Sequence, residues 1–191
     1  MLLIPAFEIG VWNAWLLMLP LALIPAILAS VRKGLFKKTK STAKLSKAEK
    51  MVFRFSKLVL ALLFLYSIFL PLKLGTLWFY VGLPISLLGI VMYIIVSVNI
   101  ANTQVDRPVT TGLYRYSRHP MYVASFIAPV GAGIATASWL FLLLSVLCII
   151  THFINGIFEE RLCLEAYGSD YQEYLDRTPR WIGIPKIVKS K

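Results

Sequence analysis

The longest charge-free run of this chain limits its possible folds more than any other feature. No Asp, Glu, Lys or Arg occurs from Met121 to Phe158, a run of 38 residues in a chain of 191. One continuous helix of that length would measure about 57 Å, nearly twice the roughly 30 Å hydrocarbon core of a bilayer. We therefore predict a hairpin of two helical crossings over 121–158, with its turn at Ala135-Thr136-Ala137-Ser138.

Three further apolar segments precede this hairpin, and we predict crossings at 9–31, 58–72 and 77–99. With 58% hydrophobic and only 15% charged residues, the composition excludes an ordinary soluble globule. The expected fold class is all-α, a single polytopic transmembrane helix bundle over 1–191. It has about five crossings, of which the last two form a helical hairpin, and a C-terminal cytoplasmic helical segment.

The positive charges set the predicted orientation. The chain carries 20 Lys and Arg against 9 Asp and Glu, a formal net charge of +11, and ten of the basic residues fall in 32–57. Five crossings place the loops 32–57 and 102–118 and the tail 159–191 on one side, so that 19 of the 20 basic residues gather there. The positive-inside rule makes that side the cytoplasm and puts the N-terminus outside. We expect no nucleic acid partner, because orientation accounts for the basic excess.

Metal and phosphate-loop chemistry lack their usual sequence signals. The two cysteines, Cys148 and Cys163, form no Cys-x-x-Cys pair, and the two histidines belong to no His-Glu-x-x-His motif. The chain also has neither of the glycine-rich phosphate motifs, Gly-x-x-x-x-Gly-Lys-Ser/Thr and Gly-x-Gly-x-x-Gly. We therefore expect no protein-bound metal and no phosphate-binding loop.

Polar residues collect where the predicted hairpin meets the cytoplasmic face. A run rich in tyrosine and cations, Thr111–Tyr122, leads into the hairpin. In the last crossing His152, Asn155 and Glu159 are spaced i, i+3, i+7, so they lie along one face of a helix. Polar groups within a membrane helix are costly and should face the bundle interior or a water-filled cavity. Of the adjacent Glu159 and Glu160, we expect one to face inward and the other outward.

Taken in order, these motifs resemble a known family. Gly-x-Tyr-x-x-x-Arg-His-Pro-x-Tyr at Gly112–Tyr122, the hairpin, the pair Glu159-Glu160, and Gly-Ser-Asp-Tyr-Gln-Glu-Tyr at 168–174 are similar to the integral-membrane methyltransferases. That family is typified by isoprenylcysteine carboxyl methyltransferase and the phospholipid methyltransferases. The resemblance covers about residues 75 to 185.

This resemblance implies S-adenosylmethionine as cofactor, bound at the cytoplasmic side beneath the hairpin in a pocket that the C-terminal tail closes. The family positions that contact the donor correspond to Tyr114, His119, Pro120, Met121, Tyr122 and Glu159, and those that frame its adenine to Arg107, Pro108 and Val109. The chemistry of the donor adds Arg118, whose guanidinium can pair with a carboxylate.

The chemistry of the methyl acceptor stays open. Asn155 stands where the isoprenylcysteine enzymes carry a substrate-binding arginine, which weakens carboxyl methylation unless Arg161 or Arg118 substitutes. An amine acceptor must lose a proton, for which His152 and Glu160 are the available bases, whereas a thiol or carboxylate needs less help. We therefore take His152, Asn155 and Glu160 as candidate catalytic residues on the acceptor side. The expected partners are a lipophilic small-molecule acceptor and membrane lipid.

Two other functions remain open. Membrane sterol reductases, which use NADPH, resemble this family in their C-terminal half but are much longer chains. A non-enzymatic scaffold could bind anionic lipid through the loop 32–57, although a scaffold needs no inward line of His152, Asn155 and Glu159. We favour a membrane methyltransferase that acts on a small lipophilic acceptor at the cytoplasmic face.

Overall fold

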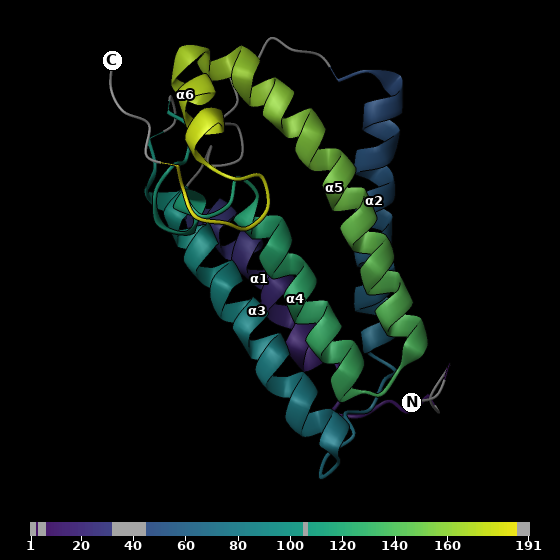
Figure 1. Ribbon diagram of the computed structural model, residues 1–191. Coiled ribbons are helices and arrows are strands. Elements are labelled where there is room, and N and C mark those ends of the chain that lie inside the picture. Colours follow the sequence, from purple (N-terminus) through teal and green to yellow (C-terminus); the bar gives the residue numbers. More distant parts are fainter. Residues whose placement is uncertain (1–2, 4–6, 32–44, 105–106, 187–191) are drawn as a thin grey trace.

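The structure is a bundle of long helices with a short helix at one end (Figure 1). This computed structural model describes residues 3, 7–31, 45–104 and 107–186. The long helices are α1 (Trp15–Val31), α2 (Lys47–Ser67), α3 (Leu77–Asn102), α4 (Pro120–Ala135) and α5 (Trp139–Tyr167); the shorter ones are the 3-10 helix η2 (Gly112–Arg115) and α6 (Ser169–Arg177). The described residues contain no β-strand, only an isolated bridge between Asn13 and Pro71. The all-α prediction is confirmed.

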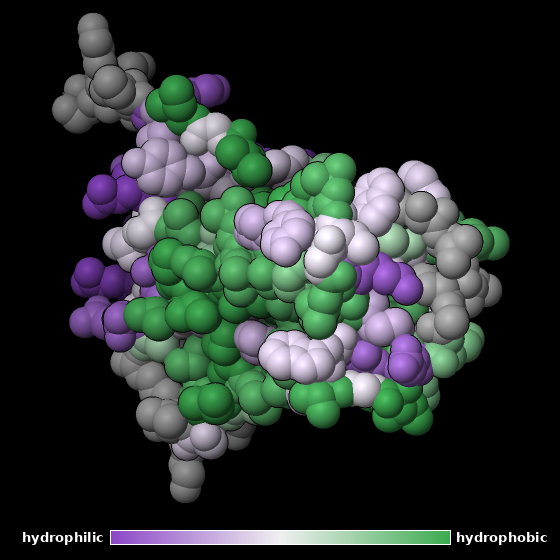
Figure 2. Space-filling model, turned by 90° about the horizontal axis from the view of Figure 1, so that it is seen from below, coloured by the Kyte–Doolittle hydropathy of each residue, from purple (hydrophilic) through white to green (hydrophobic). Residues whose placement is uncertain are grey.

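Two of the helices, α3 and α5, are long and apolar enough to cross a membrane. The apolar segments of α1, Trp15–Leu28, and α4, Pro120–Ala135, are shorter. Helix α6, η2 and the start of α2 lie at one end of the bundle, and the α2–α3 and α4–α5 turns lie at the other (Figure 1). Viewed from below, that second end is covered mainly by hydrophobic residues (Figure 2). The described parts of the three basic segments therefore share one end, while the number of crossings and their orientation stay predictions.

Helix α2 begins well before the predicted crossing at 58–72. Residues 47–57, which we expected in a basic loop, are helical because Ser46 and Glu49 form a capping box. The Glu49 amide donates to Ser46 Oγ over 3.2 Å, and the Ser46 amide donates to Glu49 Oε2 over 2.7 Å. The rest of the predicted loop, 32–44, lies outside the described residues.

The first crossing, predicted over 9–31, is helical only from Trp15. Its first residues run instead beside the segment that follows α2, where the Ala14 amide donates to Leu70 O over 2.9 Å and the Leu72 amide to Trp12 O over 2.9 Å. These bonds satisfy backbone groups that a helix would otherwise pair internally. The predicted helix therefore begins six residues late, and whether it crosses a membrane stays a prediction.

Helix α5 continues nine residues beyond the predicted end of the hairpin, Phe158. The charged residues after that point remain on the helix, supported by the i, i+4 pair of Arg161 with Glu165 at 3.0 Å. Gly168 ends the helix with φ +56°, a conformation that favours glycine. The extension carries both glutamates of the predicted site on a rigid helix rather than on a flexible tail.

Small residues hold α3 and α4 in close contact. A Cβ atom added to Gly89 would lie 2.3 Å from the Ala128 amide nitrogen, and one added to Gly131 would lie 2.2 Å from that of Ser86. Ser86 Oγ also donates to Ala128 O over 3.0 Å. Such small-residue contacts are the usual way in which helices approach each other in membranes. These contacts hold the middle and second half of α4 against α3, and the candidate site begins at the other end of the helix, at Pro120.

Candidate functional site

A cavity of about 310 Å³ lies at the α6 end of the bundle. Its volume falls in the range of small-molecule sites, about 300–1,000 Å³. Its wall is formed by the end of α3 and the segment after it, the loop before α4 and the start of that helix, the end of α5, and α6. The lining residues are Ile100, Arg107, Pro108, Val109, Tyr114, Arg118, His119, Met121, Tyr122, Glu159, Cys163, Tyr167, Tyr171 and Tyr174.

A glycine shapes the loop on the α4 side of this cavity. Gly112 begins η2 with φ +62°, and a Cβ atom there would lie 2.1 Å from Asn99 Nδ2 on α3. Glycine is therefore required both for the backbone conformation and for the close approach to α3. Further along, the His119 amide donates to Ser117 Oγ over 3.1 Å, and Pro120 occupies the first turn of α4. The loop thus places His119 and Tyr122 in the cavity wall.

Glu159 supplies a carboxylate inside the cavity. The hydroxyl of Tyr122 donates to its Oε1 atom, and its Oε2 atom lies 3.8 Å from His119 Nδ1. About 41% of the Glu159 side-chain surface is accessible, and the residue lines the cavity, so this carboxylate can receive a cationic ligand.

Tyr122 separates this cavity from a second one. Its ring stacks on His119 at 5.6 Å and on His152 at 4.5 Å between centroids. The second cavity, about 160 Å³, lies between α4, α5 and the segment after α6; it is lined by Tyr122, Val123, Phe126, Ile149, His152, Phe153, Trp181 and Ile182. Charged and phenolic groups border the first cavity. The second cavity is bordered mostly by hydrocarbon, and its polar groups come from His152 and Tyr122.

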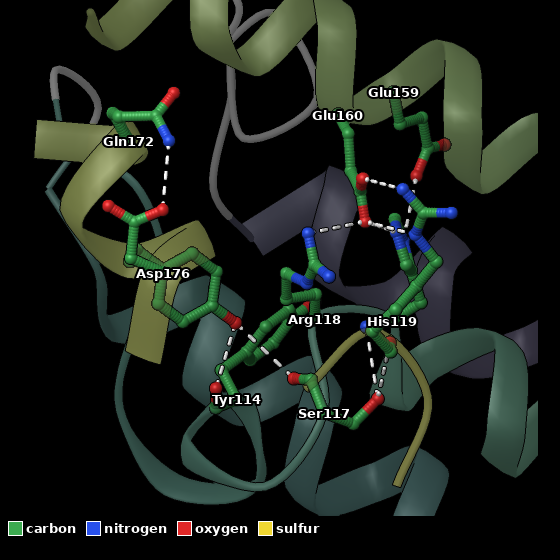
Figure 3. Close-up of polar contacts among 10 residues, drawn as sticks. Tyr114, Ser117, Arg118, His119, Glu159, Glu160, Gln172 and Asp176 are labelled. Carbon is green, nitrogen blue, oxygen red and sulfur yellow. Dashed lines mark hydrogen bonds and ion pairs between the residues drawn. The ribbon is translucent and has the colours of Figure 1, made fainter. Parts of the chain in front are cut away.

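Glu160 contacts two guanidinium groups and one imidazole, and it lines neither cavity. Figure 3 shows its contacts with Arg118 and His119. Arg180 donates to it through Nε at 3.0 Å and Nη2 at 2.6 Å. Arg118 Nη1 and His119 Nε2 both lie 3.1 Å from its Oε1 atom. The prediction that one of the two glutamates faces outward is wrong, because Glu160 is buried and His119 lies between the two carboxylates.

The C-terminal segment, which comprises α6 and residues 178–186, covers the first cavity and is held there by hydrogen bonds to backbone carbonyls. Tyr174 of α6 donates its hydroxyl to Tyr114 O over 2.8 Å and approaches Ser117 O at 3.3 Å. The Gly183 amide donates to Tyr116 O over 3.0 Å. Burial raises the pKa of the Tyr114 and Tyr174 phenols, so both stay neutral hydrogen-bonding groups.

Most of the residues predicted to contact a cofactor come together here. Nine of the ten line the first cavity; the exception, Pro120, is buried at the start of α4. On the acceptor side, only His152 lines a cavity. Asn155 instead donates to Ser56 Oγ of α2 over 2.8 Å, because the helix turns its amide toward α2. Asn155 and Glu160 thus contact protein groups and line neither cavity, and their role on the acceptor side stays a prediction.

Several residues at the two cavities were not predicted. Arg180 and Trp181 approach from a segment far along the chain, and Trp181 contacts His119 at 5.4 Å and Phe153 at 3.9 Å between ring centroids. Cys163 and Tyr167 follow Glu159 at i+4 and i+8, so helical spacing from Glu159 could have found them. No local pattern marks Arg180 as the partner of Glu160.

The described residues contain no group of three His, Cys, Asp or Glu side chains that could hold a metal ion. What the first cavity could hold is an amphiphilic organic ligand. Glu159 suits a cationic group, tyrosine faces suit a sulfonium or ammonium, and Val109, Pro108 and Ile100 suit a flat apolar ring. Arg118 Nε is buried without a hydrogen-bond partner among the described residues, so it suits a ligand carboxylate.

A bundle of apolar helices with an amphiphilic ligand cavity at one end defines the class: a membrane protein with a small-molecule site. The sequence profile of the family described as phospholipid methyltransferase matches residues 72–170, which include all of α3, α4 and α5. The chain belongs to this family.

A curated relative agrees with this assignment. The chain is 35% identical over 80 residues to a protein-S-isoprenylcysteine O-methyltransferase of Schizosaccharomyces pombe. The match covers 41% of this chain and 33% of that protein, so the similarity spans about a third of the relative's length. Neither comparison favours the reductase or the scaffold.

Proposed function

We propose that this protein transfers a methyl group from S-adenosylmethionine to a small lipophilic acceptor at the cytoplasmic face of a membrane. The proposal rests on one observation: two cavities with different linings share the ring of Tyr122 as a wall. The larger cavity offers charged and phenolic groups, the smaller one is bordered mostly by hydrocarbon, and Tyr122 lines both.

The larger cavity is the proposed donor site. Its residues fit the donor group by group: Glu159 for the cationic groups, the unpartnered Arg118 Nε for the carboxylate, and Arg107 to Val109 for the adenine. When bound, S-adenosylmethionine supplies an electrophilic methyl group on a sulfonium. The tyrosines lining the cavity offer faces for that cation, each contact worth about 0.5 to 2 kcal/mol.

The smaller cavity is the proposed acceptor site. Phe126, Ile149 and Phe153 lie on helices whose outer faces are apolar, so a lipophilic molecule can enter from the bilayer side. Its volume of about 160 Å³ is close to that of a 150 Å³ protein cavity known to hold benzene. We propose that the reacting end of the acceptor is small and that any longer hydrocarbon chain remains between α4 and α5 in lipid.

The residues around this cavity favour an amine or a thiol acceptor over a carboxylate. No Lys or Arg is among its lining residues. Arg161, one possible substitute for the family's arginine, pairs with Glu49 at 2.8 Å and with Glu165 at 3.0 Å on the exposed side of α5. Arg118 lies in the other cavity and pairs with Glu160. His152 is the group available to accept a proton from an amine or thiol.

The protein's contribution to the rate is alignment and exclusion of water. The His119–Tyr122–His152 stack fixes the common wall of the two cavities, and the C-terminal segment covers them through Arg180 and Trp181. Alignment of two bound reactants can contribute about 7–11 kcal/mol to lowering the barrier.

The test is methyl transfer in proteoliposomes with a donor that carries a tritiated methyl group. Three acceptors are compared: phosphatidylethanolamine for an amine, decanethiol for a thiol, and an S-farnesylcysteine derivative for a carboxylate. We expect label in the organic phase with the amine or the thiol. Label with the carboxylate acceptor alone would overturn the proposed acceptor class, and no label with any acceptor, together with no binding of the demethylated donor, would overturn the methyltransferase proposal.

A further inference from the structure

The outward face of α2 carries four cations in a line. Lys47, Lys50, Arg54 and Lys57 are all exposed and are spaced i, i+3, i+7, i+10. At 3.6 residues per turn these positions fall within an arc of roughly 80° and extend over about 15 Å of the helix. None of the four pairs with a carboxylate of the described residues. We call these four residues the basic ladder.

An apolar stripe adjoins the basic ladder on the same side of α2. The stripe consists of Met51, Phe55, Leu58, Leu62 and Leu65, whose exposed fractions lie between 43% and 67%. By the same helical geometry it covers roughly the next 80° and continues to the far end of the helix. The opposite face, with Ser56, Val59, Leu63 and Ser67, is buried in the bundle. The outward face of α2 is therefore basic at one end and apolar along its length.

The nearby acid does not neutralise the ladder. Glu49 lies about 200° around the helix from Lys47 and bonds to Arg161 of α5 through Oε1 at 2.8 Å and Oε2 at 3.0 Å. That bond joins α2 to α5, as does the bond from Asn155 to Ser56. Among the described residues, the ladder thus presents four uncompensated positive charges outward from a firmly packed helix.

We propose that the basic ladder binds the headgroups of anionic phospholipids whose acyl chains lie along the adjoining apolar stripe. The four cations select an anionic headgroup by charge complementarity. The adjoining apolar stripe selects a lipid over a soluble phosphate, because only a lipid has acyl chains that can cover it. Basic clusters at the end of a membrane helix attract anionic lipid, each cation contributing up to roughly a fivefold change in association. This surface is separate from both cavities, so the proposal does not depend on the methyltransferase activity.

The experiment measures lipid selectivity of the full chain in phosphatidylcholine proteoliposomes. Spin-labelled phosphatidylglycerol and phosphatidylcholine are compared by the motionally restricted fraction of the electron spin resonance spectrum. The test variant replaces Lys47, Lys50, Arg54 and Lys57 by Gln. The matched control loses the same charge elsewhere through Lys73→Gln, Arg115→Gln, Arg177→Gln and Lys186→Gln. A third variant, with Lys47, Lys50 and Lys57 replaced by Arg, keeps the charge and the helix.

We expect the native chain and the Arg variant to prefer phosphatidylglycerol, and the preference to decline toward 1 M salt, where screening shortens to about 3 Å. The ladder variant should lose most of the preference, and the matched control should keep it. Equal selectivity in the ladder variant and the control would overturn the proposal, as would a native chain without preference. Displacement by soluble glycerophosphate would also overturn it, because it would identify a phosphate site and not a lipid surface.

Discussion

Replacing Glu160 by Gln should release the C-terminal segment from the end of the bundle. Glu160 accepts from Arg180 at 2.6 and 3.0 Å and lies 3.1 Å from both Arg118 and His119. The substitution removes the negative charge and leaves two guanidinium groups without a counterion. Breaking a buried pair by removing one partner costs about 3–5 kcal/mol.

Solvent exposure lowers this cost. The side chain of Arg180 is 42% exposed, so solvent screens its share, whereas that of Arg118 is only 15% exposed. We therefore expect the substitution to weaken closing of the segment by about 2–4 kcal/mol. This change lowers the equilibrium constant for closing by roughly 30- to 1,000-fold. Limited trypsin digestion in detergent should show faster cleavage after Arg177 and Arg180, and affinity for S-adenosylhomocysteine, the demethylated donor, should fall.

The matched control is Glu165→Gln, on the same helix, which removes only an exposed contact with Arg161. It should leave the cleavage rate and the affinity unchanged. If Glu160→Gln resembled this control, with both quantities within about twofold of the native protein, the role assigned to Glu160 would be refuted.

Three further substitutions test other parts of the account. Tyr122→Phe keeps the ring stack on His119 and His152 but removes the hydroxyl that donates to Glu159, so calorimetry should show S-adenosylhomocysteine binding weakened about three- to tenfold. His152→Gln should lower kcat with an amine or thiol acceptor by about 10²-fold or more while leaving S-adenosylhomocysteine affinity intact; equal loss of both would indicate a structural role. Gly89→Ala places a Cβ atom 2.3 Å from the Ala128 amide and should lower the unfolding temperature markedly, whereas Leu88→Ala, at the neighbouring and exposed position, should change it little.

The helical architecture was largely predictable because it follows from local properties. Charge-free runs and their lengths indicated helices, and the turn at 135–138 lies between the end of α4 and the start of α5. The start of α2 was missed although Ser46 and Glu49 form a recognisable capping pattern. The late start of α1 was not predictable from the run itself, because it depends on pairing with residues beyond α2.

The site was predictable where one motif or one helix supplies the residues. Tyr114, His119 and Tyr122 belong to a single motif, and Glu159 follows on a helix. The orientation of Asn155 toward Ser56 and the pairing of Glu160 with Arg180 depend on contacts between distant segments. Helical spacing indicates which residues share a face, but it does not indicate which neighbouring helix that face meets.

The central claim is that the larger cavity binds the methyl donor through Glu159. The most direct measurement is a calorimetric titration of the purified protein with S-adenosylhomocysteine, with NADPH as a parallel ligand and with Glu159→Gln and Glu165→Gln as paired variants. The account predicts saturable binding of S-adenosylhomocysteine but not of NADPH, weakened about tenfold or more by Glu159→Gln and unchanged by Glu165→Gln. Folded protein that binds NADPH alone, or that binds S-adenosylhomocysteine equally well in both variants, would contradict it.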